Sequence, residues 1–600
     1  MPALSARLCL VVVVVALVVA LTGGPSGATQ LSLEKFQHRT KLHERFLLSW
    51  NVNSSYIVFK IDVQTAGYVG FGVSRKGGMK DTDMVVCGAD HVGGDYTCTD
   101  RYSASETTPV KDDSQDVHIY SLNLVNQHRV VTFGRKLKTG DKHDVDITHD
   151  TMRAVFAFGS DVVIVHHGAN RGTKSVLLLS YSSGRDEVLE PSTTADLLTS
   201  NFKIPSDKNT FYLCTMFKLP VLTEKHHLIK VEAVVTNGSE PYVHHMILYR
   251  CAANINGSDK QQNQCYHPNM PEPFWKCQGI TVAWAIGGEA FVYPKDVGYS
   301  LGTNGDPQYV LLEIHYDNPN LATGVVDNSG FRLFYTNQLR RYDAGIIEVG
   351  VDPSPYHIIP PHVSGFVSHG LCTTALLQDG HVSRVYVFAA LLHAHLAGRK
   401  IHVRHFRAGE EIGSIGEDNT YDFNFQESRY FPQHIEVFAG DVLVVECTYD
   451  TEERKNITTG GFETLQEMCL AYLHYYPRVS LARCRSIPNV PTLARNLLGC
   501  EVTKQSNKYT VTSPERHKGR LLEAVVAEFA WSADRVTQYE RLLRDTDYDV
   551  KLYLSNHTWL YETAKLPGAR SAGSRGDAGH PRPWRLGFEL LTVAVALLLL

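Results

Sequence analysis

The sequence contains neither a Cys-x-x-Cys pair nor a His-Glu-x-x-His motif among its 600 residues. The first absence excludes a zinc finger, and the second argues against a zinc hydrolase, which places a carboxylate base beside its paired histidines. The net charge is only −5 and no basic stripe is present, so nucleic acid is not expected as a partner. No short-period repeat occurs, which argues against a solenoid.

The size and composition are those of a globular protein with several domains. Six hundred residues exceed what one hydrophobic core holds, so about two to four domains are expected. The apolar fraction is 43% and the charged fraction is 20%, both ordinary values. Histidine stands out, with 28 residues.

The N-terminus has the pattern of a secretory signal peptide. Arg7 precedes an apolar run from Leu8 to Leu21, and small residues end at Ala28, after which cleavage is expected. The alternative is an uncleaved anchor helix, for which the apolar run is short. Five Asn-x-Ser/Thr tripeptides agree with export, and they begin at Asn53, Asn237, Asn256, Asn456 and Asn556.

The C-terminus ends in an apolar stretch over residues 585–600, and small and polar residues precede it over 569–579. This pattern fits a lipid-anchor signal that is removed, or a tail helix that stays as a single-pass type I anchor. Both alternatives hold the body of the protein at the endoplasmic reticulum or another membrane, facing the secretory lumen or the cell exterior.

Twelve cysteines agree with an oxidising compartment. Cys9 leaves with the signal peptide, so eleven remain and at least one has no intrachain partner. Cys87 and Cys98 are close in sequence and are expected to bridge. Eight further cysteines form two even sets, Cys214, Cys251, Cys265 and Cys277 in one and Cys372, Cys447, Cys469 and Cys484 in the other. Cys500 is left over, so it either links subunits or stays free.

Strand patterns predict a mainly β fold. Residues 40–165 contain short alternating runs such as 55–63 and 129–133, which predict an antiparallel β-sandwich. After a Ser/Pro-rich linker, two further β-rich regions run over 195–330 and 342–500, and a C-terminal extension over 501–580 is partly helical within 520–565. Each later β-rich region carries one histidine cluster, which suggests two related domains facing each other.

The cluster of the 342–500 region combines two histidines with a methionine. His393 and His395 are two positions apart, so on a strand both imidazoles point to the same side. Met468 follows beside Cys469, and its thioether is a soft ligand that favours Cu(I). The alternative for Met468 is an ordinary core methionine.

The cluster of the 195–330 region contains three histidines. His244 and His245 are neighbours, so on a regular strand they would face opposite ways, and both reach one metal ion only where the backbone bends. The alternative is one core and one surface histidine. His315 lies near the end of an apolar strand and is the third candidate ligand.

Two centres with different donor sets predict two copper ions with different roles. A three-histidine site can store an electron, and a site with two histidines and a thioether can hold Cu(I) for oxygen. This division of labour predicts a monooxygenase that hydroxylates a C–H bond of a small substrate. Two electrons are needed, so an external one-electron donor is expected.

At these residues the chain resembles the copper type II, ascorbate-dependent monooxygenases, and in particular the dopamine-beta-hydroxylase-like (MOXD-type) members. The resemblance covers about residues 195–500, and residues 40–165 are similar to a DOMON domain. The motifs that carry it are His244-His245-Met246, Leu311-Leu312-Glu313-Ile314-His315-Tyr316, His393-Ala394-His395-Leu396-Ala397-Gly398-Arg399-Lys400, Thr459-Gly460-Gly461-Phe462, Glu467-Met468-Cys469 and Tyr475-Tyr476-Pro477.

The resemblance implies two jelly-roll-like copper domains, ascorbate as reductant and O2 as second substrate. It implies that His244, His245 and His315 bind the electron-transfer copper, and that His393, His395 and Met468 bind the oxygen-activating copper. Tyr212 and His393 match residues with proposed active-site roles. The disulfides that it implies are Cys214–Cys265, Cys251–Cys277, Cys372–Cys484 and Cys447–Cys469.

Two positions depart from relatives. Leu391 stands where the peptide-processing branch has a carboxylate-binding arginine, so a peptide C-terminus is a poor substrate candidate. The identity of the small substrate stays open, with amines among the candidates. Thr373 and Thr374 follow Cys372 where the dopamine enzyme has another cysteine, so one bridge to the C-terminal region is missing.

The remaining alternative is a catalytically inactive, membrane-held copper-binding glycoprotein that acts through its DOMON-like domain. The presence of all six candidate ligands argues against it. Methionines and aspartates at 79–84 leave open a haem or calcium site in the DOMON-like domain, and no site is assigned there. The sequence also leaves open whether copies of the chain associate.

Overall fold

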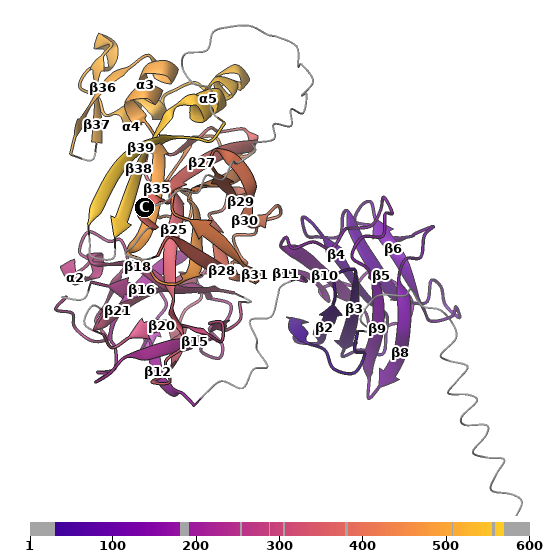
Figure 1. Cartoon of the computed structure of the whole chain (residues 1–600). Coiled ribbons are helices and arrows are strands. Elements are labelled where there is room, and N and C mark those ends of the chain that lie inside the picture. The colour runs from indigo at the N-terminus through magenta and orange to yellow at the C-terminus, as the bar shows by residue number, and fades with distance from the viewer. Residues whose placement is uncertain are drawn as a thin grey trace, which may run out of the picture.

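The computed structural model describes residues 31–568 except 180–190, 253–254, 287, 304–305, 378–381, 507 and 555–557. The predicted signal peptide and the apolar C-terminal tail lie outside these residues. The chain folds into three β-rich domains, followed in sequence by short helices (Figure 1). The predicted mainly β fold is therefore confirmed. Within the described ranges, no helix has the length and apolar character needed to cross a membrane.

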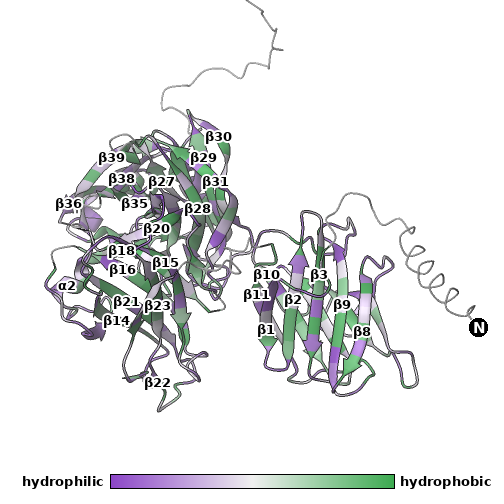
Figure 2. Cartoon of the chain, turned by 60° about the horizontal axis from the view of Figure 1, so that its bottom comes forward, coloured by the Kyte–Doolittle hydropathy of each residue, from purple (hydrophilic) through white to green (hydrophobic). Residues whose placement is uncertain are grey.

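The first domain is a sandwich of two antiparallel sheets around an aromatic core, in which Phe59, Phe71 and Phe133 contact one another with ring centroids 5.1–6.1 Å apart. The strands of the sheet in front in Figure 2 mix hydrophobic and hydrophilic residues, because one face of that sheet is buried. One sheet has the order β1 (His38–His43), β2 (Phe46–Val52), β3 (Tyr56–Val63), β9 (His128–Lys136), β8 (His118–Val125). The other has the order β11 (Arg171–Val176), β10 (Met152–Phe158), β4 (Val69–Ser74), β5 (Thr82–Gly88), β6 (Thr97–Ser103), β7 (Val110–Lys111).

The second domain also packs two sheets on one apolar core. The sheet that carries the first histidine cluster has the order β17 (Gln262–Gln264), β14 (Thr210–Lys218), β21 (Tyr309–Asp317), β16 (Val243–Cys251), β18 (Cys277–Ala285). The facing sheet contains β12 (Thr193–Leu198), β23 (Gly330–Thr336), β15 (His226–Val234), β20 (Val297–Leu301), β24 (Tyr342–Asp343) and, beside β15, β19 (Phe291–Val292). Smaller elements are the β13 (Phe202–Lys203) and β22 (Val326–Asp327) pair, and α2 (Glu272–Trp275).

The third domain has the largest core of the described chain. Its long sheet has the order β31 (Arg429–Phe438), β28 (Arg384–Ala394), β34 (Cys469–Tyr476), β25 (Gly345–Val351), β35 (Leu481–Pro488), β38 (Asp547–Leu554), β39 (Trp559–Lys565). The second sheet has the order β27 (Ser364–Thr373), β32 (Val442–Asp450), β29 (Gly398–Arg407), β30 (Glu410–Asp418). Further elements are the pairs β26 (Ile358–Ile359) with β33 (Thr458–Thr459) and β36 (Glu501–Gln505) with β37 (Lys508–Ser513), together with η1 (Ala375–Leu377), α3 (Val490–Leu498), η2 (Glu515–His517), α4 (Leu522–Ala527) and α5 (Ala533–Asp545).

The C-terminal extension is only partly helical, as predicted, and its last part completes the long sheet of the third domain. Strand β38 pairs with β35 and β39 pairs with β38. The extension is thus held to the third domain by a β ladder.

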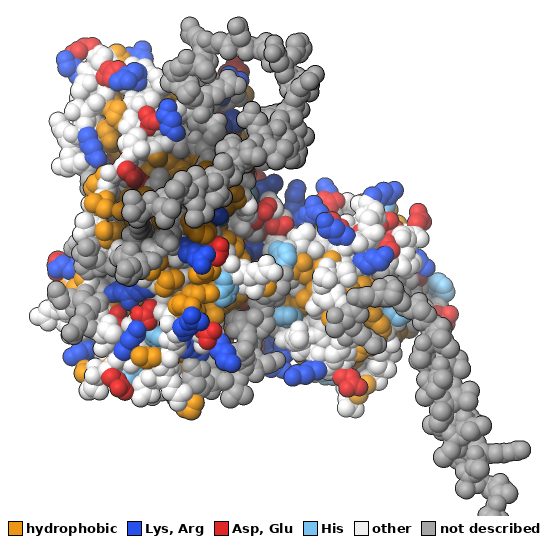
Figure 3. Space-filling view, in the orientation of Figure 1, with side chains coloured by type: hydrophobic (Ala, Val, Ile, Leu, Met, Phe, Trp, Pro, Cys, Tyr) orange, Lys and Arg blue, Asp and Glu red, His pale blue; other side chains and the backbone are white. Residues whose placement is uncertain are grey.

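All five predicted disulfides are confirmed: Cys87–Cys98, Cys214–Cys265, Cys251–Cys277, Cys372–Cys484 and Cys447–Cys469. Cys500 is free and fully buried, so in this conformation its thiol cannot reach another subunit. On the face shown in Figure 3, acidic and basic side chains are interspersed, in agreement with the low net charge.

The second and third domains share buried surface through strand β28. Its register shifts between Val387 and Ala389 in both of its pairings, and against β34 this leaves Phe388 as an extra residue. The Phe388 side chain is 1% exposed and belongs to the core of the second domain, whereas Val387 belongs to the core of the third. The bulge therefore locks the domain that holds one histidine cluster against the domain that holds the other.

The two sheets of the third domain touch backbone to backbone at one point, and this contact gives a stability prediction. A Cβ atom on Gly370 of β27 would lie 2.1 Å from the carbonyl carbon of Gly350 in β25. We expect Gly370→Ala to lower the free energy of unfolding by about 1–3 kcal/mol, because the sheets must separate. Chemical denaturation measures this change.

The matched control is Gly416→Ala in strand β30 of the same domain. The added methyl group would meet side-chain carbons of Leu392 and Ala390 at 3.5 and 3.7 Å, which is ordinary packing distance. Equal stabilities of the two variants would contradict the close approach of the sheets.

Candidate metal centre

Three neighbouring strands bring the first histidine cluster together. In the sheet register, His315 of β21 lies opposite His245 of β16 on one side and opposite Tyr212 of β14 on the other. The pairing of β16 with β21 shifts between Val243 and His245, so His244 is an extra residue in a β-bulge. The backbone bend that His244 and His245 need in order to reach one metal ion is therefore present. It allows both side chains to face His315.

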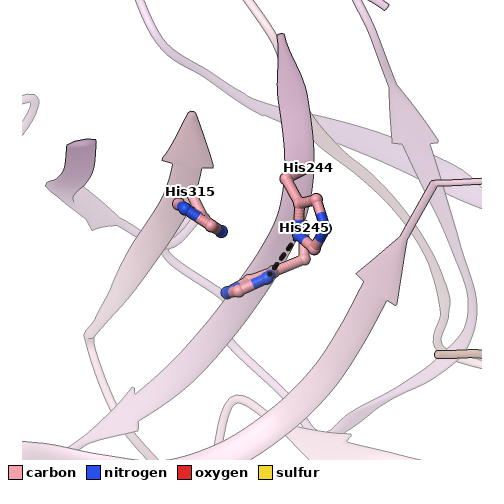
Figure 4. A group of neighbouring side chains, drawn as sticks. All are labelled: His244, His245 and His315. Carbon is pink, nitrogen blue, oxygen red and sulfur yellow. Dashed lines mark hydrogen bonds between the residues drawn. The ribbon is translucent and has the colours of Figure 1, made fainter. Parts of the chain in front are cut away.

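The three imidazoles surround a common point (Figure 4). One ring nitrogen from each of His244, His245 and His315 lies within 4.8 Å of the others. The Nδ1 atoms of His244 and His245 are 3.2 Å apart. His315 Nδ1 is buried and has no hydrogen-bond partner. Burying such a nitrogen without a partner is costly, and a metal ion bound by these three nitrogens removes the cost, so the residues fit a copper ion.

The other ring nitrogens of this cluster are held by polar side chains. His244 Nε2 donates to Asn424 Oδ1 at 3.0 Å, and His315 Nε2 lies 2.7 Å from Thr210 Oγ1. Such bonds fix the ring orientation and the tautomer of metal-binding histidines. Burial lowers the pKa of His244 and lowers the pKa of His245 and His315 well below the usual value. The neutral rings keep the lone pairs that copper needs.

The second cluster lies where two paired strands meet. Ala394 at the end of β28 pairs with Cys469 at the start of β34, so the next residues along, His395 and Met468, are opposite each other. His393 and His395 have ring centroids 5.2 Å apart with planes at 85°. Tyr449 donates to the Met468 carbonyl at 2.7 Å, and the disulfide of Cys469 holds the adjacent backbone. The strand register thus places the backbone of Met468 beside that of His395, and the His393 and His395 rings lie close together.

Both histidines of the second cluster present Nε2 for coordination. His393 Nδ1 donates to Gln426 Oε1 at 2.6 Å, and His395 Nδ1 donates to the Gln466 carbonyl at 3.0 Å. Burial lowers the pKa of His393 to about 4 and that of His395 to about 3. Two neutral imidazoles next to a buried thioether form the soft donor set expected for Cu(I).

The two clusters face each other across the boundary between the second and third domains. The Phe423 ring lies 4.9 Å from the His244 ring and 6.0 Å from the His395 ring, so it contacts one histidine of each cluster. Burial is the main cause of the lowered pKa of His393 and of His395, and an electrostatic interaction with His245 contributes to both shifts. The clusters are therefore close enough to influence each other electrostatically.

Tyr212 contacts a histidine of the first cluster and the loop that carries Met468 of the second. Its ring stacks on His315 with a centroid distance of 4.2 Å and an interplanar angle of 1°. Its hydroxyl is hydrogen-bonded to Thr464 Oγ1 at 2.7 Å, in the loop that leads to Met468. Burial raises the pKa of Tyr212, so the phenol stays protonated at neutral pH.

Several residues at the centre escaped the sequence analysis. Glu313 appears in the quoted motif without a role, yet it is 2% exposed, accepts from Tyr266 at 2.5 Å and lies 3.8 Å from His245 Nε2. Burial raises the pKa of Glu313 to about 7. Its position two residues before His315 on a strand, facing the same side, was the available signal. Asn424 and Gln426 gave no such signal, because they lie in an irregular segment.

The acidic residues of the first domain form a separate cluster. Asp83, Asp100 and Asp144 bring carboxylate oxygens within 4.8 Å of one another. Arg135 forms ion pairs with Asp83 and, at 3.6 Å, with Asp144. This guanidinium offsets part of the negative charge, and the cluster is not assigned as a site.

Comparison with known families agrees with this geometry. Residues 195–323 match the N-terminal domain of the copper type II ascorbate-dependent monooxygenases, and residues 342–496 match the C-terminal domain. Residues 42–159 match the DOMON domain. The two copper-domain matches each contain one of the two clusters.

The curated relatives match over most of the chain. DBH-like monooxygenase protein 1 of Homo sapiens is 41% identical over 541 residues, which cover 88% of this chain and 87% of the relative. DBH-like monooxygenase protein 2 of Mus musculus is 36% identical over 562 residues, covering 92% and 88%. Dopamine beta-hydroxylase of Homo sapiens is 35% identical over 449 residues, covering 73% and 72%.

Glu467 gives a prediction about how the second cluster is built. Its side chain is fully buried, and its two oxygens accept from the backbone N–H groups of His395 and Ala397 at 2.9 and 2.6 Å. In Glu467→Gln one of these N–H groups faces an amide NH2 instead of an acceptor. We expect the affinity of the second cluster for copper to fall about 10–100-fold. Competition with a chelator measures it.

Glu463→Gln is the matched control, because the Glu463 side chain is exposed on the same loop. It is expected to bind copper as the unmodified chain does. Undiminished copper affinity in Glu467→Gln would contradict the role given to this carboxylate.

Proposed function

This chain belongs to the copper type II ascorbate-dependent monooxygenases, and we propose that it hydroxylates a C–H bond of a small amine with O2 and ascorbate. The observation that carries the proposal is the pair of neutral histidine clusters, one with three imidazoles and one with two imidazoles and a thioether, that face each other across a domain boundary. A protein that held a single structural metal ion would need only one of these two clusters.

The donor sets support different roles for the two positions. We assign His244, His245 and His315 to an electron-storing copper, and His393, His395 and Met468 to an oxygen-activating copper. When bound, the two coppers supply one-electron storage and oxygen activation, so that two electrons from ascorbate and two protons convert one oxygen atom to water while the other enters the C–H bond. The chain itself orients the ligands.

An apolar cluster that includes Met468 supports a small substrate. Leu391, Leu470 and Tyr472 of the third domain pack with Met468, and Ile280 and Ala283 of the second domain pack against them. Leu391 is 4% exposed within this cluster. The side chains that form this cluster are uncharged, which agrees with the departure seen in the sequence.

The buried carboxyl of Glu313 supports the proposal that the substrate is a cationic amine. Among the described residues, His245 is the ion-pair partner of this carboxyl, and burial lowers the pKa of His245 so that its ring stays neutral. A buried carboxyl of this kind gains most from a cationic ligand, since its charge is otherwise unpaired. Tyr266 and Tyr249, which donate to Oε2 at 2.5 and 3.3 Å, fix its orientation.

Tyr212 is proposed to hold the centre together rather than to transfer a proton. Its raised pKa keeps the hydroxyl protonated, and that hydroxyl is already engaged by Thr464. Its stacking partner His315 is a proposed ligand.

The proposed compartment is the secretory pathway or the cell exterior. The five disulfides require an oxidising environment during folding. Attachment to a membrane rests on the C-terminal tail, outside the described residues, and stays a prediction from the sequence.

Met468→Ile tests the division of labour between the clusters. The substitution removes the thioether but keeps an apolar side chain of similar volume. We expect the variant to bind one copper instead of two and still to accept an electron from ascorbate, because the three-histidine cluster is intact. Oxygen uptake coupled to substrate should be abolished. Metal analysis and an oxygen electrode measure these quantities.

Met270→Ile is the matched control, because Met270 is also 8% exposed and lies in a different apolar cluster. It should keep both coppers and full turnover. Turnover retained by Met468→Ile would contradict the role of Met468, and an unmodified chain without copper-dependent oxygen uptake would contradict the proposed function.

Glu313→Gln tests whether this carboxyl binds the amino group of the substrate. We expect it to lower kcat/KM for a phenethylamine at least about tenfold, while a neutral analogue of the same shape is affected much less, since only the amine loses a charge partner. A panel of phenethylamines, other amines and glycine-extended peptides, assayed by oxygen uptake, supplies the reference substrates. Equal losses for charged and neutral substrates would contradict a role in amine binding.

A further inference from the structure

One irregular segment contacts both histidine clusters from outside the ligand set. Residues 419–428 connect β30 to β31, and we call them the bridging segment. Asn424 bonds to His244, Gln426 bonds to His393, and the Phe423 ring contacts His244 and His395.

Tyr421 of the bridging segment fixes the backbone between the two histidines of the second cluster. Its hydroxyl donates to the Ala394 carbonyl at 2.6 Å and accepts from the Ala394 N–H at 3.0 Å. The tyrosine is 4% exposed. The bridging segment therefore constrains the ligand-bearing end of β28 through backbone as well as side-chain bonds.

The outer side of the bridging segment is docked on the DOMON domain. Thr151 donates its N–H and its hydroxyl to the two carboxylate oxygens of Asp418 at 3.0 and 2.7 Å, and both residues are at most 1% exposed. Thr420 Oγ1 donates to the Thr151 carbonyl at 2.7 Å, and Arg153 Nη1 donates to the Thr420 carbonyl at 3.1 Å. Figure 1 shows the DOMON domain beside β31 and β30.

Asp422 links the side of the bridging segment that faces the histidine clusters to the side that contacts the DOMON domain. Its Oδ1 accepts from the N–H of Asn424 at 3.0 Å and so holds the turn that presents Phe423 and Asn424 to the centre. Its Oδ2 accepts from Ser175 Oγ of the DOMON domain at 2.5 Å and lies 3.5 Å from Arg153 Nε. One carboxylate thus couples the turn beside the metal centre to a different domain.

We propose that the DOMON domain is a positioning element of the copper centre, acting through the bridging segment. Ser175 and Arg153 hold Asp422, Asp422 holds the turn, and Asn424 and Gln426 then fix the ring orientations of His244 and His393. A connection of this kind matters because a displacement of about 1 Å at a reacting group costs about 10²-fold in rate. The docking of the bridging segment on the DOMON domain does not depend on copper. Only the effect of the segment on the copper centre rests on the proposed function.

The test compares full-length chains that differ at the docking contact. In the Ser175→Ala/Arg153→Ala double variant, Asp422 loses both DOMON partners, whereas neither residue contacts a proposed ligand. Ser175→Ala alone is the milder variant, in case the double variant folds poorly. Arg45→Ala is the control in the same domain, since Arg45 bonds to the Gln64 carbonyl within the DOMON domain.

The first measurement is hydrogen exchange of the metal-free protein. We expect the backbone amides of residues 419–428 to exchange about tenfold faster in the double variant, with a smaller rise in Ser175→Ala and none in Arg45→Ala. This readout does not depend on copper, so it separates failure of the docking step from failure of the proposed function.

The second measurement is electron paramagnetic resonance of the Cu(II)-loaded chains. Gln426→Ala is the reference, because it breaks the bond to His393 directly. We expect the double variant to reproduce part of the spectral change of this reference and Arg45→Ala to match the unmodified chain. Unchanged exchange in the double variant would overturn the proposal. Faster exchange with an unchanged copper spectrum would overturn it as well, because the segment would then move without moving the ligands.

Discussion

One extra residue in strand β16 makes the three-histidine cluster possible. Side chains of a regular strand alternate between the two faces of its sheet, so His244 and His245 could not otherwise meet. The bulge at His244 turns both imidazoles toward His315, which lies opposite in β21. The neighbouring ladder with β14 then places Tyr212 flat against His315. The geometry of the cluster is therefore set by strand register rather than by flexible loops, so it can exist before any ion binds.

Burial at the domain boundary provides the second condition. It depresses the pKa values of the histidines in both clusters, which keeps lone pairs free without competition from protons. The Phe388 bulge in β28 and the bond between Tyr212 and Thr464 hold the two domains in contact around the centre. The segment beside Phe423 extends this framework to the DOMON domain, so all three domains meet at the same place.

Sequence reasoning reached the ligand candidates because their evidence is local. The spacing of His393 and His395 follows from strand periodicity, and the need for a bend at His244 follows from the same rule. The contacts of Asn424 and Gln426 could not be predicted from the sequence. These two residues lie in an irregular segment, and the histidines that they contact are 180 and 33 residues away. The prediction that 520–565 is partly helical is confirmed, because α4 and α5 lie within this range. The alternation in Asp547–Leu554 was a strand signal, but its pairing partner β35 could not be identified from the sequence alone.

The central claim is that two copper ions are held by imidazoles, with a single thioether at one of them. X-ray absorption of the Cu(I)-loaded chain tests it most directly, because nitrogen and sulfur neighbours scatter differently. The account predicts two coppers per chain and a shell dominated by nitrogen with a minor sulfur contribution. A shell of nitrogen alone, or one dominated by sulfur, would contradict it.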